Sequence, residues 1–321
     1  MKYGLAVDSL QAHRKQKVIV TPEDWIRKTR ELGFDGILLS YHNLPPDKDE
    51  AAVKAFKALC DELGVAVEAR IGREQIDKAI AEGRGETVFK TAKLVGTKVM
   101  ASMLENCFVR TQGKWTEAQT EEHIKEVIAS LKRIDRHARE FDLPVGFENH
   151  IDYRTDEIER IMNEVDSPYI GLVYDTANQF FLIEDPVELC RRLAPKVFAV
   201  HFKDGYVVDD PEGVKIVWCV PGEGIVDLKE AVSILDRAGR KPNLYLELIA
   251  AQTLVIAVNN DEYWKLNGIR RDENLPAMRM FREDVKKRHP LPPADPQELL
   301  KYETESLKKS LAWMKRTLAN R

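Results

Sequence analysis

The chain has 321 residues, of which 44% are hydrophobic, and it carries a formal net charge of −4. A chain of this length and composition buries enough apolar surface for one large α/β domain or two smaller domains. The slight excess of acidic residues and the lack of a basic cluster argue against a nucleic-acid backbone or a membrane surface as its partner.

The cysteine pattern and the N-terminus indicate the expected compartment. The four cysteines form no C-x-x-C pair, so the sequence predicts neither a disulfide framework nor a thiolate zinc site. The first ten residues have too short an apolar stretch for a signal peptide, and no apolar run reaches the length of a membrane span. We therefore expect a reduced, cytoplasmic setting.

A repeated unit organises the first hundred residues. Three amphipathic segments each end in a glycine, at Gly33, Gly64 and Gly96, and each is followed by a short apolar run. A glycine just after a helix readily takes the left-handed conformation, and a short apolar run is typical of a strand that is buried on both faces. The repeated unit is therefore predicted to be a helix, a tight turn and a parallel strand.

Continuing this pattern predicts eight strands, at residues 3–7, 36–40, 65–70, 98–102, 144–148, 170–174, 197–202 and 244–248. Helices are expected between them, and the best-patterned one runs from about 117 to 140. Eight alternating strands and helices predict a closed (β/α)8 TIM barrel. A doubly wound open sheet is the alternative, but no glycine-rich phosphate loop follows any strand.

No linker divides the chain, so we expect one domain over residues 1–321. A long insertion is expected after the eighth strand, at 250–295, on the face where barrels carry their active sites. The amphipathic segment 296–318 is expected to form the closing helix.

Four successive predicted strands end in residue types that bind metals. They are Glu148, Asp175, His201 and Glu247. The carboxyl ends of barrel strands converge on one pocket, and three carboxylates with one imidazole suit a divalent ion. The sequence therefore predicts a metal site, with Mn²⁺ favoured and Mg²⁺, Co²⁺ or Zn²⁺ as alternatives.

Each of these residues also has an interpretation in which it binds no metal and serves only the structure. A buried glutamate often pairs with a basic side chain, and Arg70 and Lys203 lie at neighbouring strand ends. His201 alone is equally typical of a hydrogen-bonded core histidine. Burying three carboxylates together, however, costs several kcal/mol unless a cation compensates for their charge, which favours the metal site.

Five segments around these residues resemble one family: FENH, VYDTAN, VHFKD, VPGEGIVD and LYLELI. They are similar to motifs of the xylose-isomerase-like TIM barrels, the sugar phosphate isomerase/epimerase family, over about residues 1–250. The resemblance implies a divalent ion held by Glu148, Asp175, His201 and Glu247. It also implies proton abstraction beside a sugar carbonyl, which gives an enediolate stabilised by the ion.

Two differences from the ketose 3-epimerases narrow the type of reaction that is expected within this family. Ketose 3-epimerases resemble this family but have a histidine and an arginine where this chain has Asn178 and Val207. The chain has instead His150, two residues beyond Glu148, so its side chain is expected to point toward the same pocket.

An imidazole has a pKa near neutral pH, so it is a suitable base to remove a proton from a sugar C–H group. We predict that His150 is the catalytic base, with Glu148 and Glu247 as the other catalytic candidates. The alternative is that His150 caps its loop by bonding a backbone carbonyl.

This histidine placement also resembles the large subunits of C-glycoside deglycosidases. That resemblance implies β-elimination from a 3-keto-glycoside and a small β-sandwich partner subunit. The competing reaction is isomerisation or epimerisation of a free or phosphorylated sugar or an inosose. Family members are often dimers or larger assemblies, so we expect a homo- or hetero-oligomer.

The substrate-binding candidates are Lys203, Asn178, Arg70 and Glu105. For Lys203, the alternative is a bridge to the adjacent Asp204. A more distant interpretation is a DNA endonuclease acting at abasic sites, which has the same fold but a trinuclear zinc cluster. It requires histidines at the ends of further strands, and His42 is the only extra candidate for such a position in the first half of the chain.

Overall fold

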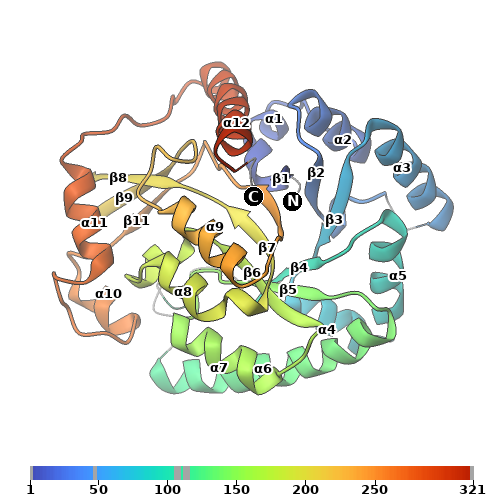
Figure 1. The fold of residues 1–321 in the computed structure, drawn as a ribbon, viewed down its shortest axis with the longest axis horizontal. Helices are drawn as coiled ribbons and strands as arrows, with labels where there is room; N and C mark the ends of the chain where they lie inside the picture. Colours follow the sequence, from blue (N-terminus) through green and yellow to red (C-terminus); the bar gives the residue numbers. More distant parts are fainter. Residues whose placement is uncertain (1–2, 46–48, 105–109, 111–115, 319–321) are drawn as a thin grey trace.

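The computed structural model describes residues 3–45, 49–104, 110 and 116–318. Its centre is a closed barrel of eight parallel strands in the order β1-β10-β7-β6-β5-β4-β3-β2 (Figure 1). This confirms the predicted (β/α)8 fold. The barrel strands are β1 (Tyr3–Ala6), β2 (Gly36–Ser40), β3 (Ala66–Arg70), β4 (Met100–Met103), β5 (Val145–Glu148), β6 (Ile170–Asp175), β7 (Val197–Phe202) and β10 (Asn243–Leu246).

Helices follow the strands and surround the barrel. Gly64 and Gly96 end two of them in the left-handed conformation, with φ of 66° and 98°, as the repeated unit predicts. The helices are α1 (Gln11–Lys15), α2 (Pro22–Glu31), α3 (Glu50–Leu63), α4 (Arg73–Ala81), α5 (Gly85–Val95), α6 (Glu117–Glu140), α7 (Thr155–Val165), α8 (Pro186–Leu193), α9 (Leu228–Arg237), α10 (Asp261–Leu266), α11 (Pro276–Val285) and α12 (Pro296–Leu318).

The barrel interior combines small residues with one large one. Tyr245 is buried there, and a Cβ added at Gly4 would lie 2.4 Å from its ring, so the glycine makes room for the tyrosine. Beside it is Glu68 of β3, whose carboxylate accepts hydrogen bonds from the backbone N–H groups of Lys98 and Val99. Burial raises the pKa of Glu68 to about 7.

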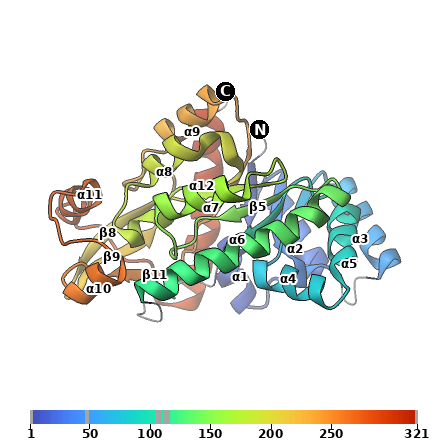
Figure 2. The same ribbon diagram turned by 90° about the horizontal axis from the view of Figure 1, so that it is seen from below.

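A second, three-stranded antiparallel sheet extends from the barrel and was not predicted. It consists of β8 (Gly205–Asp210), β9 (Gly213–Trp218) and β11 (Thr253–Ile256), in the order β11-β9-β8. Together with α10 and α11 it forms a lobe on the side opposite α3 and α5 (Figures 1 and 2). The lobe is therefore built from two insertions, one after β7 and one after β10.

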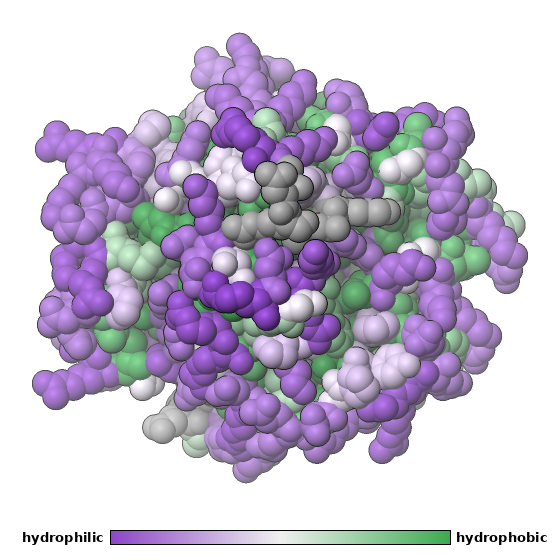
Figure 3. Space-filling model, viewed as in Figure 1, coloured by the Kyte–Doolittle hydropathy of each residue, from purple (hydrophilic) through white to green (hydrophobic). Residues whose placement is uncertain are grey.

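The last helix, α12, contacts α1 near the start of the chain. Its Glu303 is fully buried and lies 2.7 Å from Nδ1 of His13. Hydrophilic residues cover most of the face shown in Figure 3, as expected for the outer sides of amphipathic helices. Among the described residues, none of the helices is both long and apolar enough to span a membrane.

Candidate metal centre

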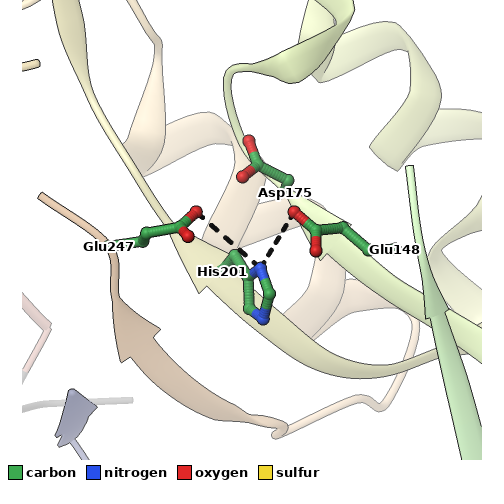
Figure 4. A group of neighbouring side chains, drawn as sticks. All are labelled: Glu148, Asp175, His201 and Glu247. Atoms are coloured by element: carbon green, nitrogen blue, oxygen red, sulfur yellow. Dashed lines mark ion pairs between the residues drawn. The ribbon is translucent and has the colours of Figure 1, made fainter. Parts of the chain in front are cut away.

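The four predicted ligands come together at one end of the barrel. Each offers one ligand atom, and these four atoms lie within 4.8 Å of one another (Figure 4). All four side chains are buried, with at most 5% of any residue exposed. The residues that form this cluster are Glu148 of β5, Asp175 of β6, His201 of β7 and Glu247, directly after β10.

Strand register explains why these positions converge. Asp175 pairs with His201 on the neighbouring strand, and His201 pairs with Tyr245 on the next. Because side chains alternate between the two faces of a strand, residues paired in register point to the same face. Glu247 lies two residues beyond Tyr245 and therefore also points toward the barrel axis.

The polar contacts within this cluster do not use every ligand atom. Nδ1 of His201 lies 3.0 Å from Oε1 of Glu148 and 3.9 Å from Oε2 of Glu247 (Figure 4). Within the described part of the chain, the other ring nitrogen of His201, Nε2, is buried without a hydrogen-bond partner. Buried polar atoms normally have such partners. Oxygen and nitrogen atoms that converge in this way fit a divalent ion.

A buried lysine compensates for part of the negative charge. Nζ of Lys203 lies 2.9 Å from Oδ2 of Asp175 and 2.6 Å from Oε2 of Glu247. The ammonium group also lies 4.7 Å from the ring centroid of Trp218, at the end of β9. The bridge from Lys203 to Asp204 considered above is not formed, because the Asp204 carboxylate accepts four backbone N–H groups of residues 205, 222, 224 and 226.

The pKa shifts of the carboxylates follow from burial and these neighbours. Burial opposes ionisation of Glu148 and Glu247, but His201 and Lys203 outweigh it and hold both pKa values below the ordinary one. Burial raises the pKa of Asp175 to about 6, against the lowering effect of Lys203. Burial lowers the pKa of Lys203, but the facing carboxylates raise it above its ordinary value. The ammonium group is therefore charged.

Two asparagines fix the ligand-bearing loops, and sequence analysis did not assign them this role. The amide of Asn149 donates to the backbone carbonyl of Asp175 and accepts from its N–H, at 3.0 and 2.7 Å. Asn178, predicted to bind substrate, donates to Oε1 of Glu148 at 3.2 Å and lies 3.4 Å from Nζ of Lys203. These amides join β5 to β6 beside the cluster.

His150 lies at the edge of the same cluster. Its side chain is partly exposed, while Nδ1 is buried and has no hydrogen-bond partner among the described residues. That nitrogen does not form the loop cap considered above. Burial lowers the pKa of His150, against the raising effect of Glu148. The next residue, Ile151, has a φ of 55°, which is rare for a β-branched side chain and fixes the backbone beside the imidazole.

Arg70, at the end of β3, belongs to the opposite side of the barrel mouth. Its guanidinium lies 2.6 Å from a carboxylate oxygen of Asp8, a residue that sequence analysis did not identify. Asp8, Glu247 and Glu148 raise the pKa of Arg70, against its burial. The remaining substrate-binding candidate, Glu105, lies outside the described residues.

The ligand set also bears on the DNA-repair interpretation. Among the described residues, Glu148, Asp175, His201 and Glu247 are the one group of metal-ligating side chains close enough to share an ion. A trinuclear cluster needs several more ligands, so the described part of the chain supports a single-ion centre.

Comparison with known proteins agrees with this architecture. The model of a family described as xylose isomerase-like TIM barrel matches residues 26–269. Inosose dehydratases of Clostridium tetani (strain Massachusetts / E88) and Geobacillus thermodenitrificans (strain NG80-2) are each 30% identical over 134 residues. Those matches cover 36% and 37% of this chain, and 44% and 45% of the two relatives. The chain thus matches less than half of the length of these curated relatives.

Two solved structures illustrate the fold similarity over nearly the whole chain. A D-psicose 3-epimerase crystallised with D-fructose has a TM-score of 0.65 at 14% identity and covers 98% of both chains. The IOLI protein with a bound zinc atom has a TM-score of 0.59 at 17% identity, over 89% of this chain and 96% of that one. At these identities the similarity concerns the fold.

Proposed function

This chain belongs to the xylose isomerase-like TIM barrel family, and from that premise we propose that it is a metal-dependent sugar lyase. Its substrate would be a cyclic polyhydroxy ketone. His150 would remove a proton beside the carbonyl, and a group on the next carbon would then leave by β-elimination.

The observation that carries this proposal is the position of His150. The imidazole is partly exposed, and burial lowers its pKa while the carboxylate of Glu148, two residues earlier, raises it. Since burial lowers its pKa, the ring is neutral near pH 7 and ready to accept a proton. Glu148 and Glu247 are weaker candidates because His201 and Lys203 stabilise their carboxylate forms and so lower their affinity for a proton.

The residues present fit a divalent ion, and Glu148, Asp175, His201 and Glu247 would hold it. Such an ion would supply Lewis-acid polarisation of a carbonyl oxygen. Asn178 orients Glu148, and Lys203 balances the charge of Asp175 and Glu247. The protein's own contribution is thus a fixed set of oxygen and nitrogen atoms beside a base, with Lys203 offsetting part of the negative charge.

The elimination step balances without a further reactant. The C–H bond beside the carbonyl breaks, its proton passes to the imidazole of His150, and its electron pair becomes part of the new C=C bond. The bond to the leaving group breaks at the same time or afterwards, and the leaving group departs with the electron pair of that bond. The protonated imidazole then returns a proton to the leaving group or to solvent.

For the leaving group, we favour the aglycone of a 3-keto-glycoside such as a C-glycoside. The lobe supports this choice, because Trp218 of β9 lies directly beside Lys203 and brings the three-stranded sheet to the site. A bulky aglycone would find its contacts there. Dehydration of an inosose is the second candidate, and the partial similarity to inosose dehydratases favours it.

Isomerisation or epimerisation of a sugar uses the same first step and remains the competing reaction class. The histidine and the arginine of ketose 3-epimerases are absent from this chain, because Asn178 and Val207 occupy the corresponding positions. Val207 is fully buried in β8, and its N–H donates to Asp284 of α11. Neither residue offers the basic group that those epimerases have there.

We extend the proposal to the ion, the assembly and the compartment. The oxygen-rich ligand set suits Mn²⁺, with Mg²⁺, Co²⁺ and Zn²⁺ as alternatives. A small β-sandwich subunit is the partner that the deglycosidase reaction would require, in a homo- or hetero-oligomer. The three cysteines in the described residues are buried and unpaired, which suits a reduced, cytoplasmic setting.

Product analysis tests the proposed reaction. The purified enzyme with added Mn²⁺ is incubated with free ketoses, an inosose, and O- and C-linked 3-keto-glycosides, each also labelled with deuterium beside the carbonyl. We expect loss of water or aglycone and a primary isotope effect. A rearranged sugar that keeps all its groups would contradict elimination, and transfer of the label to the neighbouring carbon would contradict proton abstraction.

A further inference from the structure

Asp8 holds the basic side chain on the far side of the candidate site. Asp8 follows β1, and Arg70 is the last residue of β3. Their carboxylate and guanidinium groups lie 2.6 Å apart, although β2 separates the two strands in the barrel. The pair therefore bridges over the end of β2 at the barrel mouth. About 17% of the Arg70 side chain and 30% of the Asp8 side chain remain exposed.

Asp8 is fixed relative to the metal ligands through its neighbour. The hydroxyl of Ser9 donates to the carbonyl of Leu246 at 3.0 Å and accepts from the N–H of Leu248 at 2.9 Å. These two residues flank Glu247 on either side. The loop after β1 is therefore attached to the backbone that carries a ligand.

Both basic side chains that act on the ligand carboxylates already have carboxylate partners. Lys203 contacts Asp175 and Glu247. Arg70 contacts Asp8 and also interacts electrostatically with Glu247 and Glu148. The four carboxylates of Asp8, Glu148, Asp175 and Glu247 exceed these two cations by two negative charges. One divalent ion supplies two positive charges, so the loaded site is neutral when its histidines are neutral.

We propose that Asp8 determines specificity, by pairing with Arg70 so that the site accepts an uncharged polyhydroxy ketone and rejects phosphorylated or carboxylated ones. This inference rests on the proposed function and names its substrate class. An anionic group would meet no surplus positive charge among the described side chains of the site, and it would face the Asp8 carboxylate. Placing like charges together in this way weakens binding.

The same pair provides contacts for a neutral substrate. The exposed carboxylate edge of Asp8 accepts hydrogen bonds from sugar hydroxyl groups, and the exposed N–H groups of Arg70 donate to hydroxyl or carbonyl oxygens. Hydrogen bonds to charged groups are stronger than those between neutral groups. A ring with several hydroxyl groups therefore uses both partners of the pair without separating them.

The test compares two ring ketones, the neutral scyllo-inosose and the carboxylate 3-dehydroshikimate, as competitive ligands of the metal-loaded enzyme by calorimetry. In the wild type we expect scyllo-inosose to bind at least about tenfold more tightly. In Asp8→Asn the freed Arg70 should shift this preference by about tenfold or more toward the carboxylate. Asp8→Glu, which keeps the charge, should retain the wild-type preference. Asp77→Asn is the matched control, because Asp77 pairs with Arg133 on the outer helices.

The outcomes separate this inference from the proposed function. Tighter binding of the carboxylate by the wild type would overturn the inference, as would an unchanged preference in a folded Asp8→Asn variant. If that variant does not fold, Asp8→Glu decides the matter. Retention of the wild-type preference in Asp8→Glu would support the inference, and its loss there would overturn it. Every protein in this comparison also carries His150→Gln, which suppresses turnover, so calorimetry reports binding. The inference can therefore fail while the elimination reaction stands, and the reverse also holds.

Discussion

The ammonium group of Lys203 lies between two candidate metal ligands, 2.9 Å from Asp175 and 2.6 Å from Glu247. All three side chains are at most 5% exposed. The same carboxylate oxygens are therefore held by a permanent cation of the protein and are also positioned for a divalent ion. This arrangement gives the metal-free protein a way to keep three buried carboxylates together.

Replacing Lys203 should destabilise the metal-free protein. In Lys203→Met, Asp175 and Glu247 lose their partner, and breaking a buried ion pair costs about 3–5 kcal/mol. Added Mn²⁺ should recover most of this loss, so the variant should gain more thermal stability from the ion than the wild type does. Thermal unfolding with chelator or with Mn²⁺ measures both effects.

Lys215→Met is the control for this variant, because Lys215 pairs with Asp210 at 3.0 Å in the lobe and its side chain is 30% exposed. That change should cost at most about 1 kcal/mol. A metal-free Lys203→Met protein as stable as the wild type would show that Lys203 does not compensate for the carboxylates.

Removing the imidazole of His150 should impair turnover selectively. His150→Gln should lower turnover by about 10²–10⁴-fold, the usual contribution of a general base, with metal content unchanged. His123→Gln serves as the control, because His123 lies on the outer helix α6. Near-normal turnover of His150→Gln on the true substrate would transfer the base role to Glu148 or Glu247 and favour isomerisation over elimination.

The rate of the reaction should depend on pH through His150. A base must be deprotonated to act, and burial lowers the pKa of this imidazole below 6.5. The rate should therefore fall on the acid side at a pH below 6.5, a lower pH than an unperturbed histidine would give. A pH profile of kcat/KM measures the position of this limb, and a fall that begins above pH 7 would contradict the assignment.

The carboxyl group of Glu68 should make the stability of the barrel decrease with rising pH. Its pKa is raised from 4.5 to about 7 in the folded chain, so the folded state binds more protons between these values than the unfolded state does. Stability is then lost as the pH rises from about 4.5 to about 7, by roughly 3 kcal/mol. It should change little above that window from this group.

The variant Glu68→Gln removes this titration but keeps an oxygen for the N–H groups of Lys98 and Val99. Relative to the wild type, its free energy of unfolding should therefore become larger, and the variant more stable, as the pH rises through the window. Glu122→Gln, at an exposed position on α6, should show no such trend. Urea unfolding at several pH values gives the comparison, and parallel curves for Glu68→Gln and wild type would refute the prediction.

The sequence predicted the barrel and the convergence of the ligands because both depend on local patterns. Left-handed glycines such as Gly64 and buried apolar runs define the repeated unit, and parallel strands bring their carboxyl ends to one face. The residue type at each strand end then identifies the ligand set. Neither step requires knowledge of how a particular side chain is oriented.

The lobe was missed for two different reasons. The hairpin of β8 and β9 has a turn signal in the sequence, Asp210-Pro211-Glu212-Gly213 between two strand-like runs. The prediction of eight barrel strands did not include these two runs. β11 is different, because its pairing with β9 joins segments that are distant in the chain. No local pattern specifies that partner.

Side-chain contacts within the site were the least predictable part. Lys203 was predicted to bind substrate or to bridge to Asp204. Its pairing with Asp175 and Glu247 depends on the backbone donors that occupy the Asp204 carboxylate. Asp8 was missed because its partner Arg70 comes from a strand that is not adjacent to its own. Such pairs arise from the closure of the barrel.

The metal content of the purified protein tests the central claim most directly. Elemental analysis should find one divalent ion per chain in the wild type and a large loss of that ion in Asp175→Asn, because the substitution replaces a charged ligand oxygen at the centre of the cluster by a neutral amide. An Asp175→Asn protein that keeps a stoichiometric ion would contradict the assignment of Glu148, Asp175, His201 and Glu247 as its ligands.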